Sequence, residues 1–102
     1  MMYEYWLASL YGISAGKKRL LREKFKSAEE IYNIEERELR AMGILKEKEV
    51  QTVTGVKEKD IRAEYVRMGE QGISFVPYFS EKYPKRVKRI QNPPYALYVK
   101  GK

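Results

Sequence analysis

The chain of 102 residues contains no cysteine and no histidine. Without cysteine it has no disulfide, no thiolate metal site and no cysteine nucleophile. Without histidine it has no imidazole metal ligand and no histidine-based catalytic triad. No apolar run approaches the roughly 18–20 residues of a membrane span, and the N-terminus lacks a secretory apolar region. These absences predict a soluble, cytoplasmic protein that is not an enzyme and holds no metal or cofactor.

Basic residues are in excess, and they are clustered. The net charge is +7, with 21 Lys and Arg against 14 Asp and Glu. Residues 17–26 carry a net charge of +5 and residues 81–89 a net charge of +4, whereas residues 27–72 between them carry −3. Such a distribution favours a polyanionic partner, although each cluster taken alone is also typical of a solvated helix face.

Helical periodicity dominates residues 1–71. Apolar residues recur three and four positions apart in several segments, which predicts a mainly α bundle of five to six helices. Capping patterns place helix starts at Ser27, Asn33 and Asp60, and Gly72 ends the last of these helices. In the second helix the side chains expected to point inward are Leu20, Leu21 and Phe25.

The pattern changes after residue 71. Residues 73–76 and 96–99 are typical of strands, and Pro84 between them indicates the start of a short helix. The order strand, helix, strand predicts a parallel pair joined by a right-handed crossover. Two strands do not make a stable sheet alone, so we expect residues 72–102 to open a larger Rossmann-like domain after a helical domain 1–71.

The turn between the first two helices is the first candidate site. Gly12-Ile13-Ser14 resembles the turn of a helix-hairpin-helix motif, in which small residues let the backbone approach a phosphate and helix amides point at it. Basic side chains after the turn would neutralise the charge. A purely structural turn is the open alternative. The candidate residues are Gly12, Ser14, Gly16, Lys17, Lys18, Arg19 and Arg22.

The turn departs from that motif at two positions. Ser14 stands where a second glycine is usual, and Lys18 stands where a small residue is usual. A weak repeat of the turn, Gly43-Ile44, lies 31 residues later and has nearly neutral flanks, which favours a structural role there.

The second candidate site is the short helix after Pro84. Its bases lie near three aromatic residues, Tyr78, Phe79 and Tyr83. Interleaved bases and aromatics are typical of a surface that binds single strands, and the alternative is that these aromatics fill a core. The candidate residues are Lys85, Arg86, Lys88 and Arg89.

Several motifs together resemble the DNA-processing protein A family (DprA, also called Smf). Two positions differ from the family pattern: Ser80-Glu81-Lys82 stands where an Asp is usual, and Val87 where Leu is commoner. The motifs that carry the resemblance are Tyr5-Trp6-Leu7-Ala8, Gly12-Ile13, Gly72-Ile73, Tyr83-Pro84-x-x-Val87-x-x-Ile90 and Asn92-Pro93-Pro94-x-x-Leu97-Tyr98-Val99-Lys100-Gly101.

The resemblance implies a sterile-alpha-motif-like (SAM-like) domain followed by the entry to a Rossmann-like domain. It implies a cytoplasmic bacterial protein that binds single-stranded DNA and helps to load the RecA recombinase in natural transformation (competence). In that family the DNA pocket, the dimer surface and the RecA surface belong to the rest of the Rossmann-like domain. We therefore expect this chain to be a monomeric N-terminal piece that contacts DNA phosphates without reading sequence. The alternative is a protein-protein or interdomain interaction module that does not bind DNA itself.

Overall fold

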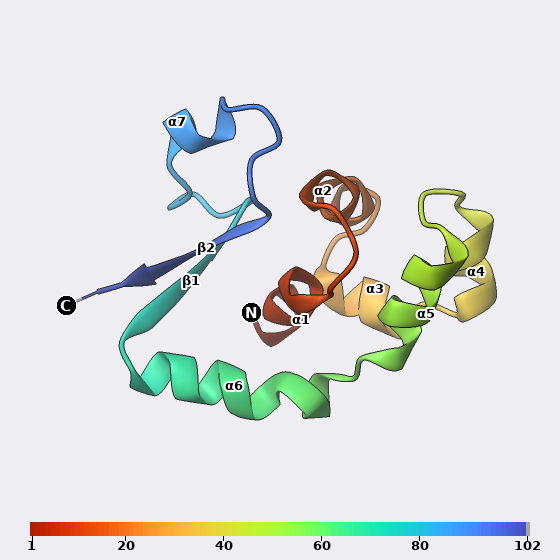
Figure 1. The fold of residues 1–102 in the computed structure, drawn as a ribbon, viewed down its shortest axis with the longest axis horizontal. Coiled ribbons are helices and arrows are strands. Elements are labelled where there is room, and N and C mark those ends of the chain that lie inside the picture. Colours follow the sequence, from red (N-terminus) through yellow and green to blue (C-terminus); the bar gives the residue numbers. More distant parts are fainter. Residues whose placement is uncertain (102) are drawn as a thin grey trace.

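The computed structural model describes residues 1–101, and there the chain is mainly helical, with seven helices and two strands (Figure 1). This confirms the predicted class. Within these residues no helix is long and apolar enough to cross a membrane. The elements are α1 (Met2–Ser9), α2 (Ala15–Glu23), α3 (Ala28–Asn33), α4 (Glu36–Ala41), α5 (Glu47–Gly55), α6 (Glu58–Glu70), β1 (Ile73–Pro77), α7 (Lys85–Lys88) and β2 (Ala96–Lys100).

The helix starts follow local capping chemistry. Ser27 caps α3 as predicted, since its hydroxyl accepts the Glu30 amide. The predicted cap at Asn33 is wrong, because Asn33 ends α3 and Glu35 precedes α4. The predicted cap at Asp60 is also wrong. Helix α6 begins two residues earlier, and the Asp60 carboxylate reaches back to accept the Lys57 amide at 3.1 Å.

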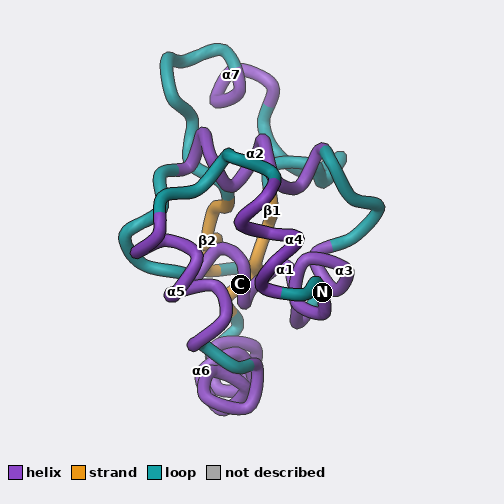
Figure 2. The backbone as a smooth tube through the Cα atoms, turned by 90° about the vertical axis from the view of Figure 1, so that its right-hand side faces the viewer, coloured by secondary structure: helices purple, strands orange, loops and turns teal. Residues whose placement is uncertain are grey.

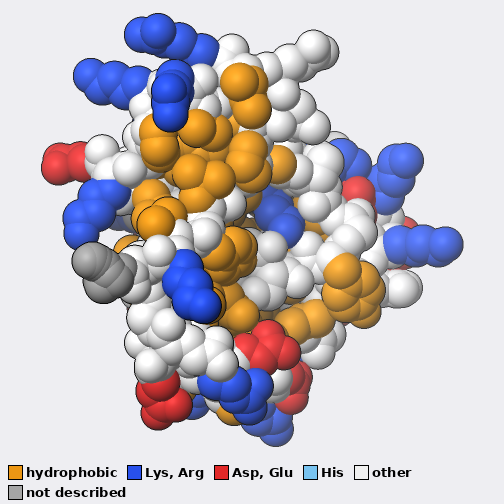
Figure 3. Space-filling model, turned by 60° about the vertical axis from the view of Figure 1, so that its left-hand side comes forward, with side chains coloured by type: hydrophobic (Ala, Val, Ile, Leu, Met, Phe, Trp, Pro, Cys, Tyr) orange, Lys and Arg blue, Asp and Glu red, His pale blue; other side chains and the backbone are white. Residues whose placement is uncertain are grey.

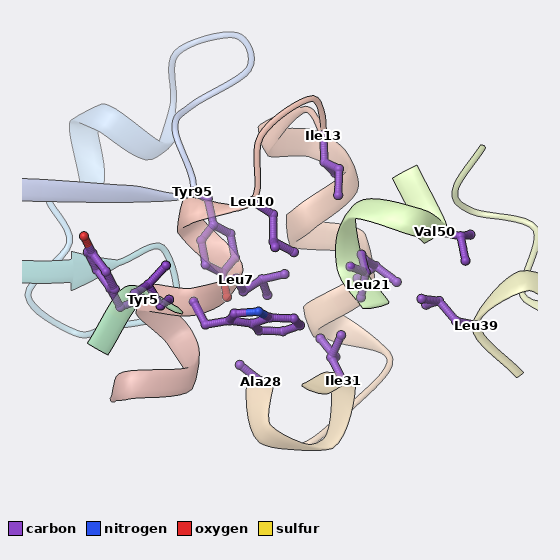
Figure 4. Close-up of a cluster of buried hydrophobic side chains, with 13 residues drawn as sticks. Tyr5, Leu7, Leu10, Ile13, Leu21, Ala28, Ile31, Leu39, Val50 and Tyr95 are labelled. Atoms are coloured by element: carbon purple, nitrogen blue, oxygen red, sulfur yellow. The ribbon is translucent and has the colours of Figure 1, made fainter. Parts of the chain in front are cut away.

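Helix α1 lies at the centre of the apolar core, with α3 and α6 packed against it (Figure 4). Trp6 is completely buried, and its indole nitrogen donates a hydrogen bond of 2.7 Å to the Val56 carbonyl at the end of α5. This bond gives the buried polar atom a partner and ties α1 to a segment fifty residues away. The other fully buried large side chains are Leu7, Leu10, Leu21, Ile31, Leu39 and Val50.

The two strands were predicted at the right positions, but the predicted parallel pairing is wrong. Strands β1 and β2 are antiparallel, with Phe75 opposite Tyr98. A parallel crossover must carry the chain back along the full strand, about 17 Å for five residues. Residues 78–95, which include α7, instead turn the chain back at the same end of the strands, so β2 runs opposite to β1. The backbone bond from the Tyr78 amide to the Tyr95 carbonyl, 2.6 Å, closes this turn.

The hairpin packs on helix α1 through aromatic rings. The Tyr5 ring lies 5.6 Å from Phe75 and 6.3 Å from Tyr98, both in edge-to-face geometry. Tyr95, at the start of β2, inserts beside Leu7 and Leu10 (Figure 4). The last thirty residues therefore share a core with the helices, while the domain division after residue 71 remains a prediction.

Candidate nucleic-acid interface

The first turn contains a glycine in the left-handed backbone conformation. Gly12 has φ = +75°, and Gly43 in the repeated turn has φ = +72°, a left-handed conformation that costs glycine little. Ser14 caps α2, and its hydroxyl accepts the Lys17 amide at 3.2 Å. The hydroxyl thus takes one of the amides that a hairpin of this kind would offer to a phosphate. A Cβ atom at Gly16 would meet nothing closer than 3.7 Å, so packing does not require glycine there.

The first basic residue of α2, Lys17, links α2 to α5. Lys17 lies between α2 and α5, where its ammonium contacts the Glu49 carboxylate at 2.9 and 3.1 Å. The same carboxylate accepts the Lys46 amide at the start of α5, at 2.7 Å. These contacts, the Lys17 bond foremost, lower the pKa of Glu49. Lys17 therefore acts first as an intramolecular partner.

Lys18 is buried inside the protein. Its side chain is 7% exposed and donates a 2.7 Å hydrogen bond to the Ala8 carbonyl near the end of α1. Burial lowers the pKa of this lysine to about 8, because an ammonium loses hydration there. Its position explains why a lysine stands where the hairpin motif has a small residue: the side chain satisfies a carbonyl that α1 leaves free.

Arg22 belongs to a buried network with the hairpin. Its guanidinium donates to Glu4 at 2.7 Å and to the Phe25 carbonyl at 3.1 Å. The second oxygen of Glu4 accepts the Tyr95 hydroxyl, also at 2.7 Å. Burial, and then this bond to a carboxylate, raises the pKa of Tyr95 well above its usual range. The Glu4 carboxylate thus connects α1, α2 and the residue just before β2.

The two basic clusters meet on one aromatic ring. The Arg19 guanidinium lies 5.3 Å from the centre of the Tyr78 ring, and the Lys88 ammonium lies 4.9 Å from it. Arg19 also donates to the Pro93 carbonyl, which fixes it against the loop before β2. Residues about seventy positions apart in the sequence therefore contribute to one basic surface.

The bases of α7 stand out from the molecule. Helix α7 protrudes at one end, where Lys85, Arg86 and Arg89 are exposed (Figure 2). Among the salt bridges that residues 1–101 form, none involves these three or Lys88. This group differs from Lys17 and Arg22, whose charges are already paired, and is free to meet an external anion.

The aromatics of this region divide between core and surface. Tyr83 is buried, and its hydroxyl donates to the Pro94 carbonyl at 2.8 Å, so it supports the loop. Phe79 is 41% exposed, and the Arg22 guanidinium lies 5.5 Å from its ring centre. The sequence placed these aromatics near α7, but gave no signal that Tyr78 would join the two clusters.

Comparisons with known proteins provide no relative against which this site can be compared. No protein-family model, curated protein or solved structure matches the chain. At the site itself, Arg19 and Lys88 lie over the Tyr78 ring, and the exposed Phe79 lies beside that ring. Three more exposed bases lie at α7. Such a surface can contact several phosphates and stack against a base, and it offers no nucleophile or acid–base pair at its centre.

Proposed function

We propose that this protein is an accessory nucleic-acid-binding module of a DprA-like protein, and that it contacts backbone phosphates without reading sequence. The single observation that carries the proposal is the basic surface at α7. Its four bases have no salt-bridge partner in residues 1–101, and one of them, Lys88, meets Arg19 on the Tyr78 ring. The sequence resemblance supplies the family, with its SAM-like and helix-hairpin-helix elements, single-stranded DNA and the link to RecA and natural transformation.

The phosphate contacts in this proposal lie mainly on α7. Lys17, Lys18 and Arg22 already serve carboxylate or carbonyl groups of the protein, and moving them to a phosphate would break those contacts. The exposed bases Lys85 and Arg86 lose only water when they meet a phosphate. Released counterions then supply the binding free energy, which makes it steeply dependent on salt.

A salt-series titration tests this function. With a fluorescent 20-nucleotide single strand, four phosphate contacts give a slope of about −3 in log K against log salt. Replacing Lys85, Arg86 and Arg89 by Glu should raise the Kd at least about tenfold at low salt, and should reduce the slope by about 2. Fluorescence anisotropy measures both quantities.

The matched control reverses three exposed bases on other helices. Lys48, Lys59 and Arg67 lie on α5 and α6, away from α7 (Figure 1), so replacing them by Glu gives the same change in net charge. We expect the control to retain most of the affinity. Equal losses in both triple variants would show that net charge alone attracts the strand and would remove the assignment to α7.

An interaction module without DNA binding is the second candidate. The half-exposed apolar side chains of Ile90, Tyr98 and Val99 favour it, because burying exposed apolar surface against a partner is favourable. Figure 3 shows apolar side chains gathered on one face of the molecule, with Lys and Arg around them. If the wild-type protein does not bind the oligonucleotide even at about 20 mM salt, this second function replaces the first.

A further inference from the structure

The outer edge of strand β1 leaves backbone groups unpaired. The register of the two strands extends to Gly72 opposite Gly101 and to Tyr78 opposite Tyr95, and each of these pairs is joined by a backbone hydrogen bond. Because paired and unpaired positions alternate in an antiparallel ladder, Ile73 and Phe75 direct their amides and carbonyls away from β2. Within residues 1–101 these groups have no hydrogen-bond partner.

Pro77 marks the end of the unpaired edge. It is the next residue whose backbone points outward, and it has no amide to leave unpaired. Its carbonyl accepts the Ser80 amide at 2.9 Å, so this end of the strand is closed. The available edge is therefore short: two amides and two carbonyls, those of Ile73 and Phe75.

A groove of about 610 Å³ runs beside this edge. Helix α6 forms its other wall with Tyr65, Val66 and Met68, while Phe75 and Val76 line the strand side. No β2 residue lines it, so the groove lies on the free side of the hairpin. A strand added to β1 would place alternate side chains against these apolar residues.

The charges at the groove are of one sign. Lys82 lines it, and among residues 1–101 the lining includes no carboxylate. The occupant that matches is therefore an apolar segment that carries an acidic group. A second copy of β1 does not match, since Ile73–Pro77 contains no acidic residue and would bring two Lys82 side chains to one interface.

We propose that the free edge of β1 and the groove beside α6 bind an extended peptide with alternating apolar residues and a carboxylate at the end near Lys82. The backbone of Ile73 and Phe75 would hold the peptide by strand addition, and Lys82 would select the acidic end. This site is separate from the α7 surface and does not depend on nucleic-acid binding.

Two labelled peptides test the charge selection. Both consist of alternating Val and Thr, and one ends in two Asp residues while the other ends in two Lys residues. We expect the full chain to bind the acidic peptide at least about tenfold more tightly, as measured by fluorescence anisotropy. Lys82→Glu should abolish or reverse this preference, whereas Lys85→Glu, with the same charge change on α7, should leave it intact. Equal effects of the two variants, or no preference in the wild-type protein, would overturn the site.

Amide exchange tests the strand addition. With the acidic peptide bound, the Ile73 and Phe75 amides should exchange at least about tenfold more slowly. The Val76 amide faces β2 already and should change little. Binding without protection of Ile73 and Phe75 would contradict strand addition. Protection that rises with protein concentration in the absence of peptide would assign the edge to a second copy and overturn the proposal.

Discussion

At the scale of single residues, the buried Lys18 shows how burial changes the pKa of a charged side chain in this protein. Lys18 lies between α1 and α2, almost without solvent contact, and donates to the Ala8 carbonyl. The carbonyl and the end of the α1 dipole favour the ammonium, while the lost hydration disfavours it. The lowered pKa of about 8 shows that lost hydration is the larger effect.

We predict that Lys18 makes the protein more stable as the pH rises from about 8 to 10.5. In this range the unfolded chain holds the lysine proton that the folded protein has lost, so the unfolding free energy increases with pH. The gain is on the order of 3 kcal/mol across the whole range. Urea unfolding at several pH values, followed by circular dichroism, measures it.

Lys18→Met provides the comparison, because methionine fills a similar volume without a charge. Near pH 7 it should be at least as stable as the wild-type protein, and the difference between the two proteins should shrink as the pH rises. Lys24→Met, an exposed lysine just after α2, should preserve the wild-type pH profile. A loss of more than about 2 kcal/mol in Lys18→Met at pH 7 would show that the bond to Ala8 outweighs desolvation.

At the scale of elements, glycines in left-handed conformations decide how helices and strands connect. Gly72 joins α6 to β1 with φ = +77°, and its carbonyl accepts the Gly101 amide across the hairpin. A Cβ atom at Gly72 would lie 3.3 Å from the Gly101 carbonyl oxygen. Gly55, at the end of α5, has ordinary φ and nothing within 4 Å of its Cβ position.

We predict opposite effects for alanine at these two glycines. Gly72→Ala should destabilise the protein by about 1–2 kcal/mol, from the left-handed backbone and the tight approach to Gly101. Gly55→Ala should be neutral or stabilise it by up to about 1 kcal/mol, because alanine favours the helix. Thermal and urea unfolding compare the two, and equal effects would contradict the assigned roles.

At the scale of the whole molecule, the hairpin and the helices share contacts that should make them unfold together. The Glu4 carboxylate joins α1 and α2 to Tyr95, just before β2, and the Tyr5 ring packs against both strands. Trp6 is the only tryptophan and lies in α1 within the buried core, so its fluorescence reports on that core.

We predict one unfolding transition for both parts. The midpoint from Trp6 fluorescence should equal the midpoint from exchange of the β1 and β2 amides that pair across the hairpin. Glu4→Gln should lower both midpoints together, because it weakens the bonds to Arg22 and Tyr95 at once. Two separate midpoints would instead support independent units at residues 1–71 and 72–102.

The amino-acid sequence by itself determined the local structure. Apolar spacing, serine caps and glycine turns predicted the helices, the strand positions and the helix start at Pro84, since these depend on neighbours in the chain. It failed at the second helix, where Leu20 was expected inside but is 42% exposed, while Lys18 is buried. The Ala8 carbonyl on α1 accepts a bond from the buried Lys18, and sequence spacing does not show that contact.

Only the tertiary structure decided the strand direction and the use of each base. The antiparallel pairing depends on where residues 78–95 turn the chain in space, because a connection of this length also suits a parallel crossover. Similarly, the sequence predicted two equivalent basic clusters, but packing paired Lys17 and Arg22 with carboxylates and left the α7 bases outside. Charge is a property of residues, whereas its availability to a partner depends on which groups the fold brings beside it.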